Sequence, residues 1–308
     1  HRDLHSFPTR RSSDLAFISE WGIHKDSISA GFDVDFMLPW PNWPAYDSLF
    51  RREFYRNLKV RPGVVYGHSF FDRHGKGDIT PFLKVFTDEY KKTRSKGYIS
   101  IISGNHDIAR ISIGRNQKDL EVIFAFLLTM PGVPFIYYGD EIGMKYLDVP
   151  SKEGGYHRTG ARTPMQWSKG RNMGFSKAPA AKLYLPVDTS KTAPDVESQT
   201  HKTNSLMNKV RKLIELRKSS PALGNDGGFE VLYAESRKYP LVYLRKQGKE
   251  RFVIVINPAD SVHKAKFSLA NATEPKLISG SKSETKTIGS NIMRSEERRV
   301  GKECRSRW

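Results

Sequence analysis

The stretch YISIISGNHDIAR, residues 98–110, decides the fold that we predict for this chain. Residues 98–102 are β-prone and apolar, and the Ser-Gly pair that follows them is typical of a buried strand that ends in a tight turn. Directly after the turn come Asn105, His106 and Asp107. Parallel α/β folds carry their functional groups at the carboxyl ends of the strands. The triplet is therefore a candidate site, and the alternative is a solvated turn whose aspartate precedes a helix.

On either side of this stretch, strand-like segments alternate with helix-like ones. We expect strands over residues 16–22, 31–40 and 132–141, and helices over residues 46–58, 79–94 and 118–130. Strands and helices that alternate at this spacing predict a parallel sheet with helical crossovers.

The pattern changes in the last third of the chain. A long segment rich in Gly, Lys, Pro and Thr, residues 142–203, leads to a helix expected over 204–218. Beyond Pro221 the chain reads as short strands with period-two alternation, GFEVLYAE, YPLVYLRK, RFVIVINPA and AKFSLA. This pattern predicts a separate antiparallel β domain.

The two ends of the chain are related to each other. Residues 294–308, RSEERRVGKECRSRW, can be encoded by a DNA whose reverse complement, read one base out of frame, encodes residues 1–15, HRDLHSFPTRRSSDL. That DNA resembles a sequencing-library adapter, so we predict that both ends are adapter-derived scars and leave them out of fold reasoning. The predicted domains are then residues 16–220, part of an α/β domain, and residues 221–293, an all-β domain whose last strand we expect to be cut short.

Composition limits the classes of function. The two ends contribute +1 and +3 of the net charge of +18, which leaves +14 for residues 16–293. The single cysteine, Cys304, lies in a predicted scar, so we expect no disulfide, zinc-thiolate site or cysteine nucleophile. No apolar run approaches the ~20 residues of a membrane span. The basic residues are scattered and accompany no nucleic-acid motif, so we expect neither a membrane nor a nucleic acid as partner. Localisation and oligomeric state stay open.

Five ordered motifs carry a family resemblance. They are AFISEWG, GFDVDFMLPW, ISGNHD, MPGVPFIYYGDEIGM and RTGARTPMQW. Their order resembles that of the α-amylase family, glycoside hydrolase family thirteen. The resemblance implies the C-terminal half of a (β/α)8 TIM barrel, strands five to eight, followed by a small antiparallel β-sandwich. The forms RTPMQW and VPFIYYGDEIGM are similar to the branch with α-glucosidases, oligo-1,6-glucosidases and trehalose synthases. This branch implies retaining hydrolysis or transfer at α-glucosidic bonds of starch-derived or related oligosaccharides.

The resemblance also implies roles for particular residues. Glu20 matches the family's general acid/base, Asp107 matches the third carboxylate, which steadies the transition state, and His106 matches its substrate-binding neighbour. Acetal cleavage needs a proton donor and nearby negative charge, which two carboxyl groups supply. The apolar neighbours of Glu20, at positions 17, 18 and 21, would desolvate its carboxyl group and raise its pKa.

Further residues are candidates for substrate binding or for support. We expect the sugar to be bound by Asn105, His106, Arg158, Arg162 and Trp167. The two arginines have an alternative role as ion-pair partners of Asp140 and Glu141, acids that we expect to support a loop. Asp33 and Asp35 alternate along their strand and should point the same way. The resemblance implies no organic cofactor. Calcium is possible, but the part of the family pattern present in this chain does not support it.

The nucleophile of the family is an aspartate at the end of the fourth barrel strand, within a motif that also holds an arginine. No such motif precedes Ala16. We therefore expect this chain to be catalytically inactive by itself.

Two other classes of protein compete with this interpretation. GNHD is also a signature of metallophosphoesterases, and Asp72, His74 and Asp78 lie upstream in the matching order. Too few residues separate these acids to place each at its own strand end, which argues against a two-metal site. The second alternative is an amylase-like protein that binds carbohydrate without catalysis, which the sequence leaves open.

Overall fold

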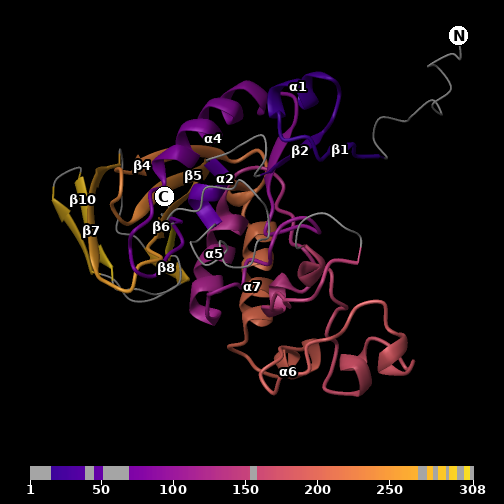
Figure 1. Cartoon of the computed structure of the whole chain (residues 1–308). Coiled ribbons are helices and arrows are strands. Elements are labelled where there is room, and N and C mark those ends of the chain that lie inside the picture. Colours follow the sequence, from indigo (N-terminus) through magenta and orange to yellow (C-terminus); the bar gives the residue numbers. More distant parts are fainter. Residues whose placement is uncertain are drawn as a thin grey trace, which may run out of the picture.

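The computed structural model describes residues 15–38, 45–50, 69–152 and 158–269, together with the backbone of strands at 276–279, 284–288, 291–296 and 302–305. Figure 1 shows a central pair of helices, α5 and α7, with the C-terminal strands on one side. The loop-rich segment around α6 lies below these two helices in this view. None of the described helices is long and apolar enough to cross a lipid bilayer.

A parallel sheet forms the N-terminal part of the molecule, as predicted. Its strands are β1 (Ile18–Ser19), β2 (Val34–Met37) and β3 (Tyr98–Ile101), in the order β1-β2-β3. Both pairings are parallel, with Ser19 level with Asp35 and Asp35 level with Ile99. Because β2 is the middle strand, it is hydrogen-bonded along both edges.

The prediction of a fourth strand over residues 132–141 is wrong. It is reduced to one parallel bridge between Ile102 and Phe135. Its proline, Pro134, has no N–H to donate, and Gly132 has a left-handed φ of 92°. The Ser103 hydroxyl also replaces a backbone partner, since it accepts the hydrogen bond of the Tyr137 N–H at 2.9 Å. The segment therefore runs beside β3 without extending the ladder.

Helices pack on the sheet as their apolar periodicity predicts. Connections and cover are provided by α1 (His24–Ser29), α2 (Ala45–Phe50), α4 (Thr80–Thr93), α5 (Gln117–Thr129), α6 (Val196–Thr200) and α7 (Leu206–Ser219). Phe82 and Phe86 of α4 are fully buried, and almost every residue of α5 is buried. Each such side chain contributes about 1.5–3 kcal/mol. Residues 51–58 of the predicted 46–58 helix lie outside the described part.

The segment between residues 142 and 203 is ordered by short turns and contains no strand in its described part. A 3-10 turn at Asp140–Ile142 leads into it, and further 3-10 turns within it lie at Thr159–Ala161, Arg171–Gly174 and Ala180–Lys182. A further one, Pro221–Leu223, follows α7.

The C-terminal strands are antiparallel, as predicted. They are β4 (Gly228–Tyr233), β5 (Leu241–Gln247), β6 (Glu250–Ile256), β7 (His263–Ser268), β8 (Lys276–Ser279), β9 (Glu284–Ile288), β10 (Asn291–Glu296) and β11 (Lys302–Arg305). Two sheets form, β4-β5-β6-β11-β8 and β7-β10-β9. The predicted sandwich arrangement and the domain limits stay predictions.

Alternate residues of β5 face two different cores. Leu241 and Tyr243 join the large core that contains α4 and α5, whereas Val242 and Leu244 pack with Phe267 of β7. The β part therefore shares its core with the helical part.

Strands β10 and β11 include residues 294–296 and 302–305, which the sequence analysis set aside. A strand can pair with an open sheet edge through backbone N–H and C=O groups alone. These strands therefore do not test the adapter origin of the ends, which stays a prediction.

Two buried arginines surround the carboxyl end of α5. Arg217 of α7 donates from Nη1 to the carbonyl oxygens of Leu128 and Met130, both at 2.9 Å. Arg245 of β5 donates to the Thr129 oxygen and, at 2.6 Å, to the Gly224 oxygen. Burial lowers the pKa of each guanidinium to about 10, so both stay charged at neutral pH. We call this pair the carbonyl cage; it satisfies carbonyls that the helix leaves without intrahelical partners.

Candidate active site

Glu20 follows directly after β1, at the carboxyl end of that strand. Its side chain is exposed, and Oε1 accepts a hydrogen bond from Nδ2 of Asn105 at 3.0 Å. Asn105 follows β3, so this contact joins the ends of two strands that are separated by β2. The structure therefore brings together the two motifs that the sequence placed at strand ends.

The Asn105 amide connects the Glu20 carboxylate with the backbone of Asp107. Its oxygen accepts hydrogen bonds from the backbone N–H groups of Asp107, at 2.8 Å, and Ile108, at 3.0 Å. Asn105 itself is only 7% exposed. Its amide thus fixes the Asp107 turn with one end and contacts Glu20 with the other. A direct role in sugar binding stays a prediction.

Asp107 receives two guanidinium groups on one oxygen. Nη1 of Arg158 lies 2.7 Å and Nη2 of Arg162 lies 2.8 Å from Oδ1. Arg162 Nε also donates to the His106 carbonyl at 2.8 Å, and His106 Nε2 lies 3.5 Å from Asp107 Oδ2. Both arginines belong to the loop beyond residue 142, which therefore closes on the strand ends. The sequence left them a choice between a sugar and the acids at 140 and 141; the structure pairs them with Asp107.

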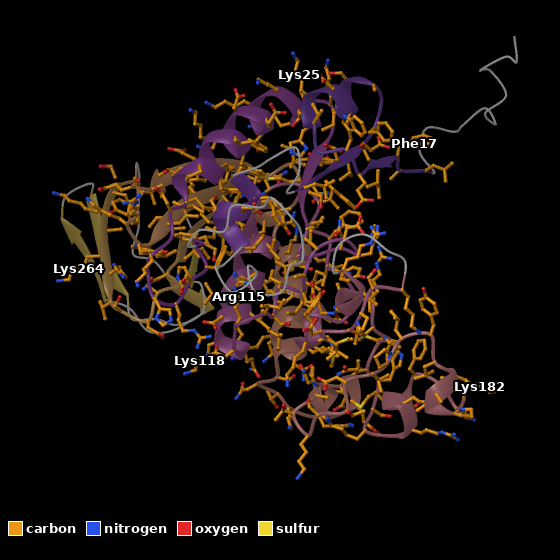
Figure 2. The ribbon with its side chains drawn as sticks, in the orientation of Figure 1. Phe17, Lys25, Arg115, Lys118, Lys182 and Lys264 are labelled. Carbon is orange, nitrogen blue, oxygen red and sulfur yellow. The ribbon has the colours of Figure 1, made fainter. Side chains whose placement is uncertain are left out.

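The prediction that apolar neighbours enclose the Glu20 carboxyl group is wrong in this structure. Phe17 is 40%, Ile18 is 42% and Trp21 is 63% exposed, so these side chains do not enclose the Glu20 carboxylate. The reason is that β1 is a two-residue strand at the edge of the sheet. Figure 2 shows Phe17 at this edge of the molecule.

Asp33 and Asp35 both bind the segment that carries Glu20. Asp33 Oδ2 accepts the Phe17 N–H at 2.7 Å, and Asp35 Oδ1 accepts the Gly22 N–H at 3.2 Å. Their surroundings differ, however, since Asp33 is exposed and Asp35 is fully buried. Burial alone would raise the pKa of Asp35, but the hydrogen bonds from His24 and Gly22 outweigh it and hold that pKa below its usual value.

Asp140 supports the fold, as expected from the sequence. It is fully buried, and it accepts hydrogen bonds from Ser103 Oγ at 2.8 Å and Arg110 Nη1 at 3.2 Å. Burial raises the pKa of its carboxyl group, and Arg110 opposes that rise. Burial also raises the pKa of Glu141.

Two residues beside this site, Arg110 and His24, were not predicted from the sequence. Arg110 is fully buried and its guanidinium lies 4.9 Å from the centre of the Tyr138 ring. A signal for it existed, because a lone arginine interrupts the apolar run after the NHD triplet. His24 is buried against Asp35, and no local pattern marks it.

Two further candidates are accessible but less closely connected. The side chain of His106 is 50% exposed, and Trp167 is 51% exposed. The backbone N–H of Trp167 donates to the Met173 carbonyl at 2.8 Å. Asn172 and Met173, in the turn beside it, both have positive φ. None of the described contacts joins Trp167 to Asp107, so its predicted role in sugar binding stays a prediction.

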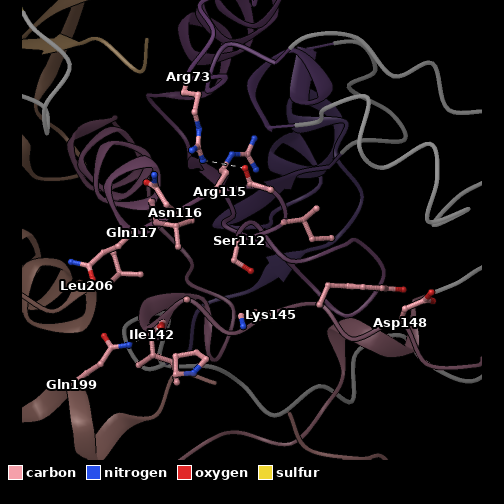
Figure 3. Close-up of a pocket in the computed structure, with 16 residues that line it drawn as sticks. Arg73, Ser112, Arg115, Asn116, Gln117, Ile142, Lys145, Asp148, Gln199 and Leu206 are labelled. Atoms are coloured by element: carbon pink, nitrogen blue, oxygen red, sulfur yellow. Dashed lines mark hydrogen bonds between the residues drawn. The ribbon is translucent and has the colours of Figure 1, made fainter. Parts of the chain in front are cut away.

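A cavity lies apart from this cluster. It has a volume of about 620 Å³ and is lined from the loops that begin at Ser112 and Ile142. Figure 3 shows Arg73, Asn116 and Gln199 around it, with Arg73 donating to the Gly114 carbonyl at 3.3 Å. No predicted site residue lines it. The candidate site is instead an open one, at the carboxyl edge of the parallel sheet.

The metallophosphoesterase alternative is not favoured. Asp78 accepts hydrogen bonds from the backbone N–H of Thr80, the first residue of α4, at 2.8 Å and from the Ser236 hydroxyl at 2.5 Å. Asp72 accepts the His74 N–H at 3.0 Å within a local turn. Within the described ranges, no three His, Cys, Asp or Glu side chains are grouped so that they could hold a metal ion. The cofactor prediction itself remains untested.

Comparison with known proteins agrees with this geometry. Residues 72–226, half of the chain, match the family described as alpha amylase, catalytic domain. A trehalose synthase from Thermus thermophilus is 38% identical over 149 residues, which cover 47% of this chain and 15% of that protein. A salivary alpha-glucosidase from Aedes aegypti is 34% identical over 194 residues, which cover 58% of this chain and 32% of that protein.

Solved structures show the same fold. An alpha-amylase from H. orenii superposes with a TM-score of 0.66 at 20% identity, over 95% of this chain and 54% of that one. The chain thus spans about half the length of that structure and less than a third of the Aedes glucosidase. In the described part the barrel is not closed, as expected for part of a TIM barrel. From the family match, the identities and the fold together, the chain belongs to the α-amylase family.

Proposed function

We propose that the protein to which this chain belongs is a retaining α-glycosidase or transglycosidase that acts on α-glucosidic bonds. The observation that carries this proposal is the Asn105 amide, which joins Glu20 and Asp107 at the carboxyl ends of two parallel strands. Relatives named trehalose synthase and alpha-glucosidase support the substrate class. We propose starch-derived or related oligosaccharides as substrates and assign no single linkage.

In this proposal Glu20 is the proton donor and acceptor. It protonates the leaving glycosidic oxygen and later removes a proton from the incoming water or sugar hydroxyl. Its exposed position at the strand end makes the carboxyl group accessible to a substrate. The nucleophile, following the family resemblance, is an aspartate of the fourth barrel strand, which we predict to lie outside this chain.

Asp107 provides negative charge and hydrogen-bond acceptors for the sugar. Its Oδ1 is bound by Arg158 and Arg162, whereas Oδ2 has the weaker 3.5 Å contact with His106. Oδ2 is thus the oxygen better placed to accept a sugar hydroxyl. The two arginines orient the Asp107 carboxylate, and together with His106 they can contact the same ring.

Binding to the chain itself is the first test. Saturation-transfer NMR with maltose, trehalose and isomaltose should detect binding of at least one sugar, and Asp107→Ala should weaken it about tenfold, the loss expected for a charged hydrogen bond. Asp88→Ala, on the exposed side of α4, is the control and should bind as the unchanged chain does. Equal binding by the Asp107 variant would contradict the assigned role.

Activity is the second test. The 308-residue chain should not hydrolyse 4-nitrophenyl α-glucoside. A chimera in which residues 16–220 replace the matching part of the Thermus trehalose synthase should turn over α-glucosides and retain the anomeric configuration, and Glu20→Gln should remove at least about 100-fold of its rate. Turnover by the chain alone would disprove the predicted absence of the nucleophile. Sugar binding without turnover in a folded chimera would indicate the non-catalytic alternative.

A further inference from the structure

The strand that presents Glu20 is weakly held by its own backbone. β1 has two residues and pairs with β2 only at Ile18 and Ser19. No strand is described on its other edge. Two ladder positions at a sheet edge are expected to open readily. Something else must therefore fix the residues that follow the strand.

A buried carboxylate behind the strand supplies that hold. Asp35 lies on β2, the middle strand, and its side chain is fully buried. Its Oδ1 accepts hydrogen bonds from both backbone N–H groups that follow Glu20, those of Trp21 at 3.3 Å and Gly22 at 3.2 Å. Hydrogen bonds to an ionised acceptor are the stronger kind, so a central strand anchors the exit of the edge strand.

A histidine holds the other oxygen of the same carboxylate. His24 Nδ1 lies 2.7 Å from Asp35 Oδ2, and the His24 side chain is 1% exposed. An ionised carboxylate only accepts hydrogen bonds, so Nδ1 carries the proton. His24 is the first residue of α1 and follows Gly22, whose φ of 78° favours glycine. The turn from β1 into α1 is thus attached to Asp35 at both of its ends.

We propose that His24 and Asp35 form a positioning pair that holds the turn after Glu20 and so sets where the Glu20 carboxylate lies. Asn105 contacts Glu20 at its carboxylate, whereas the pair fixes its backbone. The importance of this position for catalysis rests on the proposed function. The hold on the turn is a property of the fold and can be tested without any activity.

The test measures the turn directly. Hydrogen exchange of the Trp21 and Gly22 amides is followed by NMR in the full chain, relative to a slowly exchanging β6 amide that reports global unfolding. Trp21 is also labelled as 5-fluorotryptophan, its line being assigned with Trp21→Phe. In Asp35→Asn and His24→Ala, exchange of the two amides should accelerate about tenfold more than exchange of the β6 amide does. The Trp21 fluorine line should also shift. His24→Asn, which keeps a side-chain N–H near the Nδ1 position, should restore most of the protection.

A matched control separates positioning from general destabilisation. Ile28→Ala removes a buried side chain from the same helix, without touching the turn. It should lower the free energy of unfolding but leave the relative exchange of Trp21 and Gly22 unchanged. The proposal is overturned if Ile28→Ala exposes these amides as much as His24→Ala does, or if Asp35→Asn leaves them protected. A failure of the chimera to turn over α-glucosides would contradict the proposed function and leave this result intact.

Discussion

Two pairs of arginines in this molecule differ in what they bind and in how deeply they are buried. Arg158 and Arg162 converge on one carboxylate, Asp107, at the open end of the parallel sheet, with side chains that are 26% and 18% exposed. Arg217 and Arg245 are buried at the other end of α5, where they bind backbone carbonyls. The first pair is held by the Asp107 carboxylate, which can also accept hydrogen bonds from a polar ligand. The second pair is held by backbone carbonyls, among them those of Leu128, Thr129 and Met130 at the carboxyl end of α5.

This contrast separates residues that stabilise the fold from residues that can respond to a ligand. A partly exposed ion pair contributes about 0–1 kcal/mol, because water solvates its members well when they separate. A buried guanidinium that fills several carbonyl positions cannot be removed without leaving those oxygens unsatisfied. We therefore expect the carbonyl cage to determine folding and the arginines of Asp107 to determine ligand response.

The largest expected effect comes from opening the carbonyl cage. Arg245→Met keeps the length and apolar stem of the side chain but removes its donors, so carbonyls of Thr129 and Gly224 lose a partner. The free energy of unfolding should fall by about 3 kcal/mol or more, measured by urea denaturation. Lys246→Met is the control: this neighbour is exposed and pairs with Glu230, so its effect should stay within about 0.5 kcal/mol. Similar losses in both variants would contradict the role of the cage.

Removing one arginine from Asp107 should give the reverse profile. Arg162→Met is expected to change the free energy of unfolding by less than about 1 kcal/mol. Sugar affinity should fall several-fold in the same variant, because Asp107 loses one of its orienting partners. Titration calorimetry and urea denaturation on one preparation measure both quantities. A loss of stability as large as that of Arg245→Met would erase the distinction between the two pairs.

Acid should weaken the sheet edge before it affects the carbonyl cage. The folded-state pKa of Asp35 lies below the value of 3.8 expected for an unfolded aspartate. Its contribution to stability is therefore complete above about pH 4 and is lost as the pH falls through the lower folded-state pKa. The stability difference between the unchanged chain and Asp35→Asn should shrink between pH 5 and pH 2, as followed by urea denaturation. A constant difference over this range would show that the charge of Asp35 is not involved.

The smallest effect is expected on β7, in the sheet next to the cage. Burial lowers the pKa of His263 below its ordinary 6.5. A base with a lowered folded-state pKa is protonated more readily when unfolded, so stability is lost as the pH falls below about 6.5. His263→Gln should flatten the pH dependence of unfolding between pH 7 and pH 5 by a few tenths of a kcal/mol. An unchanged slope would exclude His263 as its source.

Local patterns predicted most of the elements. The parallel strands, α4, α5, α7 and the C-terminal strands through β7 follow from periodicity of two or 3.6 along the chain. The segment 132–141 failed because its apolar run hides a proline, a left-handed glycine and a competing serine hydroxyl. Glu20 and Asp107 were chosen from their motifs, and the structure places both after strand ends, whereas their roles stay predictions.

Long-range polar contacts could not be predicted in this way. Arg245 reaches a residue 116 positions away, and His24 meets Asp35 only after α1 has turned back toward β2. A buried charge is stabilised by partners that folding brings to it, so no neighbouring residue identifies it in advance. The carbonyl cage and the positioning pair are both of this kind.

The Asn105 amide also has a mechanical consequence. It reaches across the end of β2, from the strand of Asp107 to the strand of Glu20, so the separation of the two carboxylates depends on how far neighbouring strands rotate against each other. Phe36 of β2, which packs edge-on against Phe135 at 4.8 Å between ring centres, helps to fix that rotation. We therefore expect that substitutions in β2 can change the spacing of Glu20 and Asp107 without contacting either residue.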